Sequence, residues 1–323
     1  MTKKLNKILV TGGAGFIGSH ITDKLLSLGY EVTVLDNFDT GKEENLSLNT
    51  GKNLKIVRGD IRDIKLLQSL LKDNDAVFHE AAIASVSISV QDPLLSNEVN
   101  VTGTLNVLKA SVDCGIKRFI FASSAAVYGD SDESLKKETM ILNPRSPYGT
   151  TKLSAESYAR VFYKAYGLET VALRYFNVYG PRQRFDKNSA YGGAITIFIN
   201  RLLSDLPPII NGDGEQTRDF VYIDDIVNSN ILALTAKDAP GEVLNIGTGK
   251  NVSVNKIAEL IKNLLNKQNI ANVHGPAKLT DIKHGYADIT KAKKILNYVP
   301  NYQIETGLPN LINWYLTKTN RPK

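Results

Sequence analysis

Tyr148 and Lys152, four residues apart in the run SPYGTTK (146–152), are the strongest chemical signal in this chain. On a helix, such a pair lies on one face, one turn apart. A lysine ammonium beside a phenol stabilises the phenolate, and bringing the phenol pKa from about 10 to near 7 takes roughly 4 kcal/mol. A phenolate tuned in this way can accept a hydroxyl proton while the carbon beneath loses a hydride. The alternative interpretation is a solvated helix face that carries both side chains.

A glycine-rich loop near the start of the chain would hold a cofactor for that hydride. Gly12, Gly15 and Gly18 follow the pattern Gly-x-x-Gly-x-x-Gly between an apolar run and a helical pattern that opens with Phe16 and Ile17. Glycines at this spacing allow a tight turn and let the backbone approach a pyrophosphate, which rests on the helix N-terminus. We therefore expect a dinucleotide site here.

Asp36 indicates which dinucleotide binds. It ends the second β-type run, where a carboxylate hydrogen-bonds the adenosine ribose hydroxyls and repels a 2′-phosphate, so NAD is favoured over NADP. Asn37 adjoins it, and Asp60 and Ile61 follow the third run, where they would flank the adenine. The alternatives are a capping aspartate in an Asp-Asn turn at Asp36 and ordinary turn residues at Asp60 and Ile61.

The first half of the chain alternates β-branched runs with helical patterns, which is typical of βαβ units and a parallel sheet. The predicted strands cover residues 7–10, 31–35, 54–58, 76–80, 118–123, 169–175 and 243–246, and the predicted helices 16–28, 97–114, 148–166 and 251–266. Gly29 would close the first helix, and Ser253 would cap the last one.

These elements predict an α/β fold, a Rossmann-type doubly wound parallel sheet with a smaller mixed α/β substrate-binding lobe. The NAD-binding domain would span residues 1–175 and regain about 220–248, and the lobe would comprise 176–219 and 249–323. Residues 177–219 are rich in Gly, Pro, Arg and Asn, which suggests loops that carry substrate contacts.

Composition narrows the class of protein further. The 323 residues carry a net charge of +6 without a dense basic block, so a nucleic-acid partner is not expected, and no stretch is long enough for a membrane span. The scattered positive charge would suit an anionic small molecule, or merely a generally basic proteome. Cys114 is the only cysteine, so no intrachain disulfide can form; we expect it in the interior of a cytoplasmic protein. The 4 histidines lack metal-ligand spacing, so no metal site is expected.

Several longer motifs resemble those of the extended short-chain dehydrogenase/reductase family, and within it the UDP-hexose 4-epimerases. They are residues 11–20, the HEAA run at 79–82, residues 121–128, residues 148–152, LRYFNVYGPRQ at 173–183 and NGDGEQTRDFVY at 211–222. The resemblance implies that Ser124 bonds the sugar O4 and relays its proton to Tyr148, unless it is a simple strand-end cap. Related dehydratases place an acidic pair near Ala125 and Ala126, so dehydration is not expected.

The resemblance also implies contacts with the two ligands. It assigns Ala81 and Asn100 to the cofactor, and Ser85, Asn177, Tyr191, Arg218, Lys278 and Asp281 to the UDP-sugar. Arg218 would bind the diphosphate with its planar fork, or pair with a surface acid instead. At Lys278 many relatives have an arginine, so the bidentate geometry is lost there.

Gly285 matches the family position beside the sugar C2 substituent. A bulky residue there closes the pocket to N-acetyl groups, whereas glycine leaves room, so UDP-GlcNAc and UDP-GalNAc are expected substrates along with UDP-Glc and UDP-Gal. The alternative is that Gly285 serves a turn.

Three other functions remain open from the sequence. An epimerase of UDP-glucuronate would need a cation near C6, which the sequence does not place; a net oxidoreductase would release reduced cofactor; and a non-catalytic dinucleotide sensor would not need Ser124, Tyr148 and Lys152. The resemblance further implies a homodimer built on helices 97–114 and 148–166.

Overall fold

The computed structural model describes residues 5–46, 51, 53–129, 131, 133–184, 193–277 and 283–319. None of the helices in these ranges combines the length and the apolar character that crossing a membrane requires.

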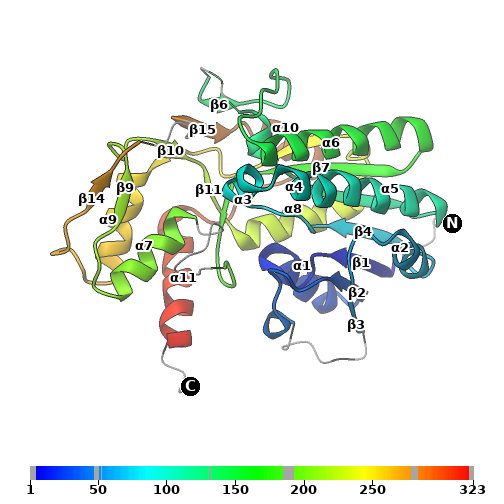
Figure 1. The fold of residues 1–323 in the computed structure, drawn as a ribbon, viewed down its shortest axis with the longest axis horizontal. Helices are drawn as coiled ribbons and strands as arrows, with labels where there is room; N and C mark the ends of the chain where they lie inside the picture. Colours follow the sequence, from blue (N-terminus) through cyan, green and yellow to red (C-terminus); the bar gives the residue numbers. More distant parts are fainter. Residues whose placement is uncertain are drawn as a thin grey trace.

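A parallel sheet of 7 strands forms the centre of the larger part of the molecule, in the order β12-β7-β5-β4-β1-β2-β3 (Figure 1). Its strands are β1 (Lys7–Thr11), β2 (Glu31–Asp36), β3 (Leu54–Arg58), β4 (Ala76–His79), β5 (Arg118–Ser124), β7 (Glu169–Tyr175) and β12 (Val243–Ile246). The chain runs outward from β1 to β3 and then returns to β4 on the other side of β1. Ligand crevices form outside the carboxyl ends of the strands at such a reversal. This is the predicted doubly wound arrangement.

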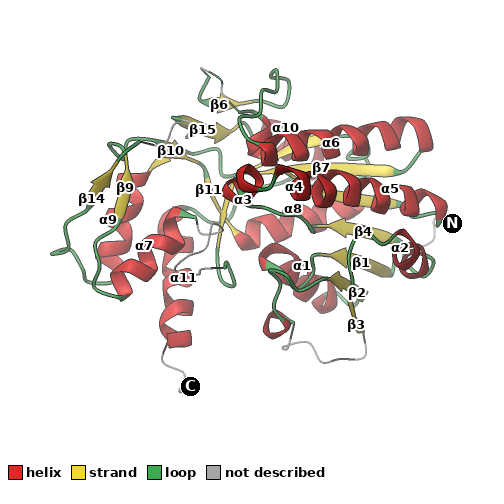
Figure 2. Ribbon diagram, viewed as in Figure 1, coloured by secondary structure: helices red, strands yellow, loops and turns green. Residues whose placement is uncertain are grey.

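Helices cover both faces of this sheet (Figure 2). They are α1 (Phe16–Ser27), α2 (Ile64–Leu71), α5 (Thr104–Asp113), α6 (Pro147–Tyr166) and α8 (Ile223–Thr235). Successive strand residues face opposite sides, so β1 contributes to two cores. Ile8 and Val10 pack in the core that includes α1 and α8, whereas Leu9 packs in the core that includes α2, α5 and α6.

A smaller mixed sheet has the order β13-β10-β15-β6. Its strands are β6 (Leu135–Lys136), β10 (Thr217–Arg218), β13 (Val252–Ser253) and β15 (His284–Ala287). β10 runs antiparallel to β13 and parallel to β15. The predicted lobe began at residue 176, but β6 brings two earlier residues into the sheet because it pairs with β15.

The remaining elements surround the small sheet or connect it to the large one. The paired strands are β8 (Asn177–Tyr179) with β11 (Phe220–Tyr222) and β9 (Ile209–Asn211) with β14 (Val273–Gly275). The α-helices are α3 (Val86–Gln91), α4 (Pro93–Asn97), α7 (Ala194–Leu203), α9 (Val254–Leu264), α10 (Thr290–Leu296) and α11 (Ile304–Thr319). Two short 3₁₀ helices, η1 (Glu43–Asn45) and η3 (Ala125–Val127), and one π-helix, η2 (Glu98–Gly103), complete the set.

The predicted strands 54–58, 169–175 and 243–246 have the observed bounds. Two other predictions were wrong. The helix predicted from residue 251 begins only at Val254, because Val252 and Ser253 pair with β10; Ser253 caps it as expected, accepting from Lys256 N at 3.2 Å. The loops predicted for 177–219 include helix α7, whose apolar side chains pack in the core.

Cys114 is only half-buried, which corrects the prediction of an interior position. It lies at the C-terminal end of α5 just before Gly115, whose φ of 71° turns the chain out of the helix. Its thiol donates to the Gln68 carbonyl at 3.6 Å.

Candidate active site

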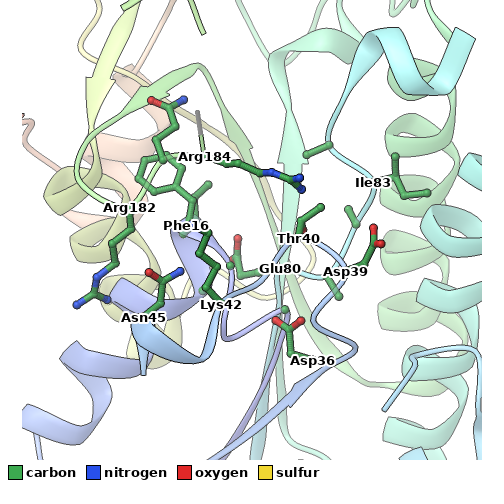
Figure 3. A pocket seen from close by; sticks show the side chains of 18 of the residues that line it. Phe16, Asp36, Asp39, Thr40, Lys42, Asn45, Glu80, Ile83, Arg182 and Arg184 are labelled. Atoms are coloured by element: carbon green, nitrogen blue, oxygen red, sulfur yellow. The ribbon is translucent and has the colours of Figure 1, made fainter. Parts of the chain in front are cut away.

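A cavity of about 800 Å³ opens at the reversal of the strand order (Figure 3). Residues from distant parts of the chain line it, among them Gly12, Gly15, Asp36, Glu80, Ala81, Ser124, Tyr148, Arg182, Arg184 and Trp314. The cavity therefore joins the glycine loop to the predicted catalytic tyrosine.

The glycine loop has the shape that a phosphate-binding turn requires. Gly12 adopts φ +68°, and a Cβ there would lie 2.7 Å from the Ala81 nitrogen, while one at Gly18 would collide with the Gly12 carbonyl. The residue before α1 is Gly15, so no side chain caps the first N–H groups of the helix. These open donors fit the pyrophosphate of a dinucleotide. Phe16 and Ile17 also line the cavity.

Asp36 lies on the cavity wall and also organises its own loop. Its carboxylate accepts from Ala14 N at 2.9 Å and from Phe38 N at 2.8 Å. Burial raises the pKa of Asp36, and these two hydrogen bonds oppose that shift. The carboxylate thus caps N–H groups of its own loop and at the same time borders the space where a ribose would lie.

Asp60 and Ile61 line the cavity next to Asn37. The Arg62 guanidinium binds both Asp60 oxygens, at 3.0 and 2.9 Å, and its hydrogen bond holds the pKa of Asp60 below the usual value. The Asn37 side chain also hydrogen-bonds Asp60. This carboxylate is therefore fixed in its ionised form beside the predicted adenine position.

Ser124 and Tyr148 meet on the cavity wall from different elements. Ser124 ends β5 and accepts from Ala126 N at 3.1 Å, so it is a strand-end cap as well as a cavity residue. Tyr148 lies in the first turn of α6 and its backbone N–H donates to Ser89 Oγ at 3.0 Å. Its phenol lies near the Ser124 hydroxyl, which opposes the rise that burial causes in the pKa of Tyr148. This arrangement suits proton transfer between a serine and a tyrosine.

Lys152 lies one turn along α6 and is buried. Its Nζ donates to the Ala122 carbonyl at 2.8 Å and lies 5.1 Å from the centre of the Phe121 ring. Burial lowers the pKa of Lys152 to about 8, and the Glu80 charge opposes this shift.

The expected lowering of the Tyr148 pKa is not present in this structure. Burial raises the pKa of Tyr148, the Ser124 hydrogen bond lowers it, and the Glu80 charge raises it. Helix spacing reveals neither the burial of the phenol nor the carboxylate across from it, and the positive charge of a bound nicotinamide ring would act in the predicted direction.

Glu80 is a cavity residue to which the sequence assigned no role. It follows β4 in the HEAA run, and the Tyr175 hydroxyl donates to its Oε1 at 3.0 Å. Burial raises the pKa of Glu80 to about 7. An acidic residue at the end of an apolar strand was the signal that could have revealed it.

Asn100 and Ser85 lie behind the cavity wall, each with 2% of its surface exposed. The Asn100 side chain accepts from Ile83 N at 2.8 Å and donates to Ile83 O at 3.0 Å and to Thr151 Oγ1 at 3.1 Å. Ser85 caps α3 by accepting from Ile88 N. Ala81, by contrast, lines the cavity itself.

The predicted diphosphate and sugar residues gather in the smaller lobe. Arg218 and Gly285 are paired neighbours in β10 and β15, and Asn177 donates to the Asp219 carbonyl at 3.2 Å. Gly285 has ordinary strand geometry rather than a turn, and a Cβ there would have only Lys136 Cε nearby, at 3.6 Å. Tyr191, Lys278 and Asp281 lie outside the described residues.

Sequence reasoning also missed the residues that close the cavity on the lobe side. Arg182, Arg184 and Trp314 line it, and Arg182 pairs with Asp23 of α1 at 2.6 Å. Figure 3 shows the Arg184 side chain reaching across the cavity. The GPRQ run was a signal for Arg182, whereas nothing local marked Trp314.

The model of the NAD dependent epimerase/dehydratase family matches residues 8–247. The chain belongs to this family. A UDP-glucuronate 4-epimerase of Thermodesulfobacterium geofontis is 36% identical over 318 residues, which covers 95% of each chain. The described residues contain no group of His, Cys, Asp and Glu side chains that could hold a metal ion.

Two solved structures show the same fold over nearly the whole chain. The UDP-glucose 4-epimerase of Thermotoga maritima with UDP-glucose is 40% identical, with a TM-score of 0.91, and covers 97% of this chain and 100% of that one. The UDP-N-acetylglucosamine 4-epimerase of Methanobrevibacter ruminantium with UDP-N-acetylmuramic acid is 40% identical, with a TM-score of 0.92, and covers 98% and 99%. Enzymes named as UDP-sugar 4-epimerases are thus among the relatives of this chain.

Proposed function

We propose that this enzyme inverts C4 of a UDP-hexose through a transient 4-keto sugar. The observation that carries the proposal is that Ser124 and Tyr148 lie on the wall of the same cavity as the glycine loop and Asp36, with Lys152 one turn from the tyrosine. A proton acceptor and a dinucleotide-binding loop are therefore combined at one site.

In the proposed mechanism, Tyr148 takes the C4 hydroxyl proton, directly or through Ser124. Bound NAD would accept the C4 hydride and give it back, and its oxidised ring would favour the phenolate. Asn177 and Arg218 would hold the diphosphate while the sugar turns about its glycosyl-phosphate linkage. Tyr148 would then give the proton back to the C4 oxygen, and because the turned sugar presents its other face, the hydride would return to the opposite face of C4, which inverts that carbon.

Gly285 supports N-acetylated substrates. Because the position has strand geometry and a Cβ there would make only an ordinary contact with Lys136 Cε, the absent side chain supports a role beside the sugar better than a role in a turn. One of the structural relatives is a UDP-N-acetylglucosamine 4-epimerase. We therefore propose UDP-GlcNAc and UDP-GalNAc as substrates, with UDP-Glc and UDP-Gal also accepted.

The test is to incubate the purified protein separately with UDP-GlcNAc, UDP-Glc and UDP-glucuronate, without and with added NAD, and to follow products by proton NMR. Conversion of UDP-GlcNAc to its 4-epimer is the expected result. Conversion of UDP-Glc alone would agree with the proposed mechanism but would exclude the proposed role of Gly285 in admitting N-acetyl sugars. Net release of reduced cofactor would indicate an oxidoreductase, and binding without turnover would indicate a sensor.

UDP-glucuronate is the second candidate substrate. The sequence could not place a cation for its carboxylate, but Arg184 lies on the cavity wall, and a UDP-glucuronate 4-epimerase is among the relatives. An arginine offers a planar fork to a carboxylate. Preferential conversion of UDP-glucuronate would favour this substrate over the N-acetyl sugars.

We also propose a homodimer with the predicted helices at its interface. Of the predicted helices 97–114 and 148–166, the second carries an exposed apolar side chain, Val161, which is 53% exposed. Two more precede the first predicted helix, on α3 and α4, which contact α6: Val90 is 58% exposed and Leu94 79%. A second copy of the chain would cover this face. Sedimentation should show a dimer for the wild type and a monomer for Leu94→Glu, whereas an unchanged mass would contradict this interface.

The domain division stays a proposal, with the cofactor part at 1–175 and 220–248 and the substrate lobe at 176–219 and 249–323. β12 supports the regained segment because it pairs with β7. We also propose a cytoplasmic location, because a chain with a single cysteine forms no intrachain disulfide. Cell fractionation would test this proposal.

A further inference from the structure

Glu80 is a carboxylate inside the cavity that the proposed mechanism does not use. It directly follows His79, the last residue of β4, and lies among the side chains that line the cavity (Figure 3). An anionic side chain at this position faces a space where a dinucleotide and a sugar would meet.

A chain of two hydrogen bonds fixes this carboxyl group. It begins on α8, which covers the face of the sheet opposite to α6. Asn230 Nδ2 on α8 donates to the Tyr175 hydroxyl oxygen at 2.7 Å, and the Tyr175 hydroxyl donates to Glu80 Oε1 at 3.0 Å. A phenol has only one hydrogen to donate, and the Asn230 amide occupies its oxygen as a donor. Glu80 is therefore held as an acceptor, which favours its ionised form.

The titratable groups around Glu80 come from several elements. Tyr148 and Lys152 face it from α6 and Tyr175 from β7, while Arg184 lines another part of the cavity wall. His79 contributes no charge, because burial lowers its pKa to about 3 and both ring nitrogens are engaged, by Thr11 at 2.7 Å and Thr104 at 2.9 Å.

Lys152 needs a negative partner because it is buried. Its ammonium donates to the Ala122 carbonyl, a neutral acceptor, and among the described residues no carboxylate lies within ion-pair distance of it. Glu80 is the candidate by geometry: it directly follows β4, whose last residue pairs with Phe121 beside Ala122, and it lines the same cavity as Tyr148. Its negative charge acts on both Lys152 and Tyr148.

We propose that Glu80 is a positioning residue for the Tyr148–Lys152 pair: its carboxylate is the counter-charge of the buried lysine and sets the pH range in which the pair transfers protons. The inference rests on the proposed function, in which this pair does the chemistry.

Neutralising Glu80 should move the whole pH profile in one direction. Its negative charge raises the pKa of both Tyr148 and Lys152. Without the charge both groups lose their protons at lower pH, so the acidic and the basic limbs of kcat/KM both shift to lower pH. Because burial raises the pKa of Glu80 itself to about 7, the difference from the wild type should grow above that pH, where the carboxylate is ionised.

The test variant is Glu80→Gln, which keeps the size of the side chain and an oxygen for the Tyr175 hydroxyl. Its kcat/KM profile should shift by about one pH unit, a tenfold change in the acid dissociation constant. Glu80→Asp should restore the wild-type profile. Glu259→Gln removes the same charge from the exposed face of α9 and should leave the profile unchanged.

A second readout does not depend on the choice of sugar. Titration of tyrosinate absorbance in Glu80→Gln, with Glu80→Gln/Tyr148→Phe subtracted, gives the pKa of Tyr148 directly, and this value should lie below that of the wild type measured in the same way. If Glu80→Gln does not fold, Glu80→Leu removes the charge without a buried amide.

An unshifted tyrosinate titration in a folded, charge-neutral variant overturns the proposal. A wild type that converts no UDP-sugar contradicts the proposed function instead, and the tyrosinate titration still decides the role of Glu80. The two failures are therefore distinguishable.

Discussion

The proposed cofactor side and the proposed substrate side of the site are built in different ways. Gly12, Asp36, Glu80 and Ser124 all follow or end strands of one parallel sheet, so their positions depend on a buried framework. Arg218 and Gly285 lie instead on strands of 2 and 4 residues in the smaller sheet. Such short strands contribute few ladder hydrogen bonds of their own.

The smaller sheet depends on one buried carboxylate, Asp219. It accepts from Thr248 N at 2.8 Å, Thr248 Oγ1 at 2.7 Å, Gly249 N at 2.9 Å and Ala287 N at 3.1 Å. Asp219 follows Arg218 directly, and Ala287 ends the strand of Gly285. The cofactor side is thus held by a whole sheet, and the substrate side by a few charged hydrogen bonds.

The largest expected effect is a loss of kcat without a loss of ligand binding, caused by a substitution on the cofactor side. Tyr148→Phe removes the proton acceptor but keeps the aromatic ring, so kcat should fall by about 10²–10⁴-fold. Binding of cofactor and UDP-sugar, measured by calorimetry, should change little. Tyr166→Phe, an exposed position at the end of the same helix, is the matched control and should keep full activity. A fully active Tyr148→Phe would exclude this tyrosine as the base.

The same contrast explains how far the sequence could predict the molecule. Strands 54–58 and 169–175 follow from local patterns, because apolar runs and glycine spacing specify a buried parallel sheet. The role of Ser124 beside Tyr148 came instead from the family resemblance. The wall formed by Trp314, the charge of Glu80 near Tyr148, and the pairing of β6 with β15 depend on contacts between distant segments. No local pattern encodes such contacts.

The next effect in size is a weaker binding of the UDP-sugar, without a change in cofactor binding. Asp219→Asn places an amide donor against N–H donors, which costs about 3 kcal/mol of folding free energy. Because Arg218 and Gly285 lie on the strands that Asp219 joins, the KM for UDP-sugar should rise while cofactor affinity stays within about twofold. Asp225→Asn is the matched control, since this buried carboxylate accepts from Asn301 N and Tyr302 N away from β10 and β15. Equal losses of cofactor and sugar affinity in Asp219→Asn would show that the two sides are not independent.

The smallest expected effect concerns selectivity alone. The backbone at Gly285 is that of an ordinary strand, and a Cβ there would make only an ordinary contact with Lys136 Cε at 3.6 Å, so a side chain can be added without backbone strain. Gly285→Tyr should fill the space beside the sugar and lower kcat/KM for UDP-GlcNAc relative to UDP-Glc by about 10–100-fold. Gly285→Ala adds a methyl group at ordinary contact distance and should leave the ratio nearly unchanged. If Gly285→Tyr lowers kcat/KM for UDP-GlcNAc and UDP-Glc equally, Gly285 is needed for the folding of the smaller sheet and not for the N-acetyl pocket. A residue that lines this pocket discriminates between the two sugars, whereas a folding defect does not.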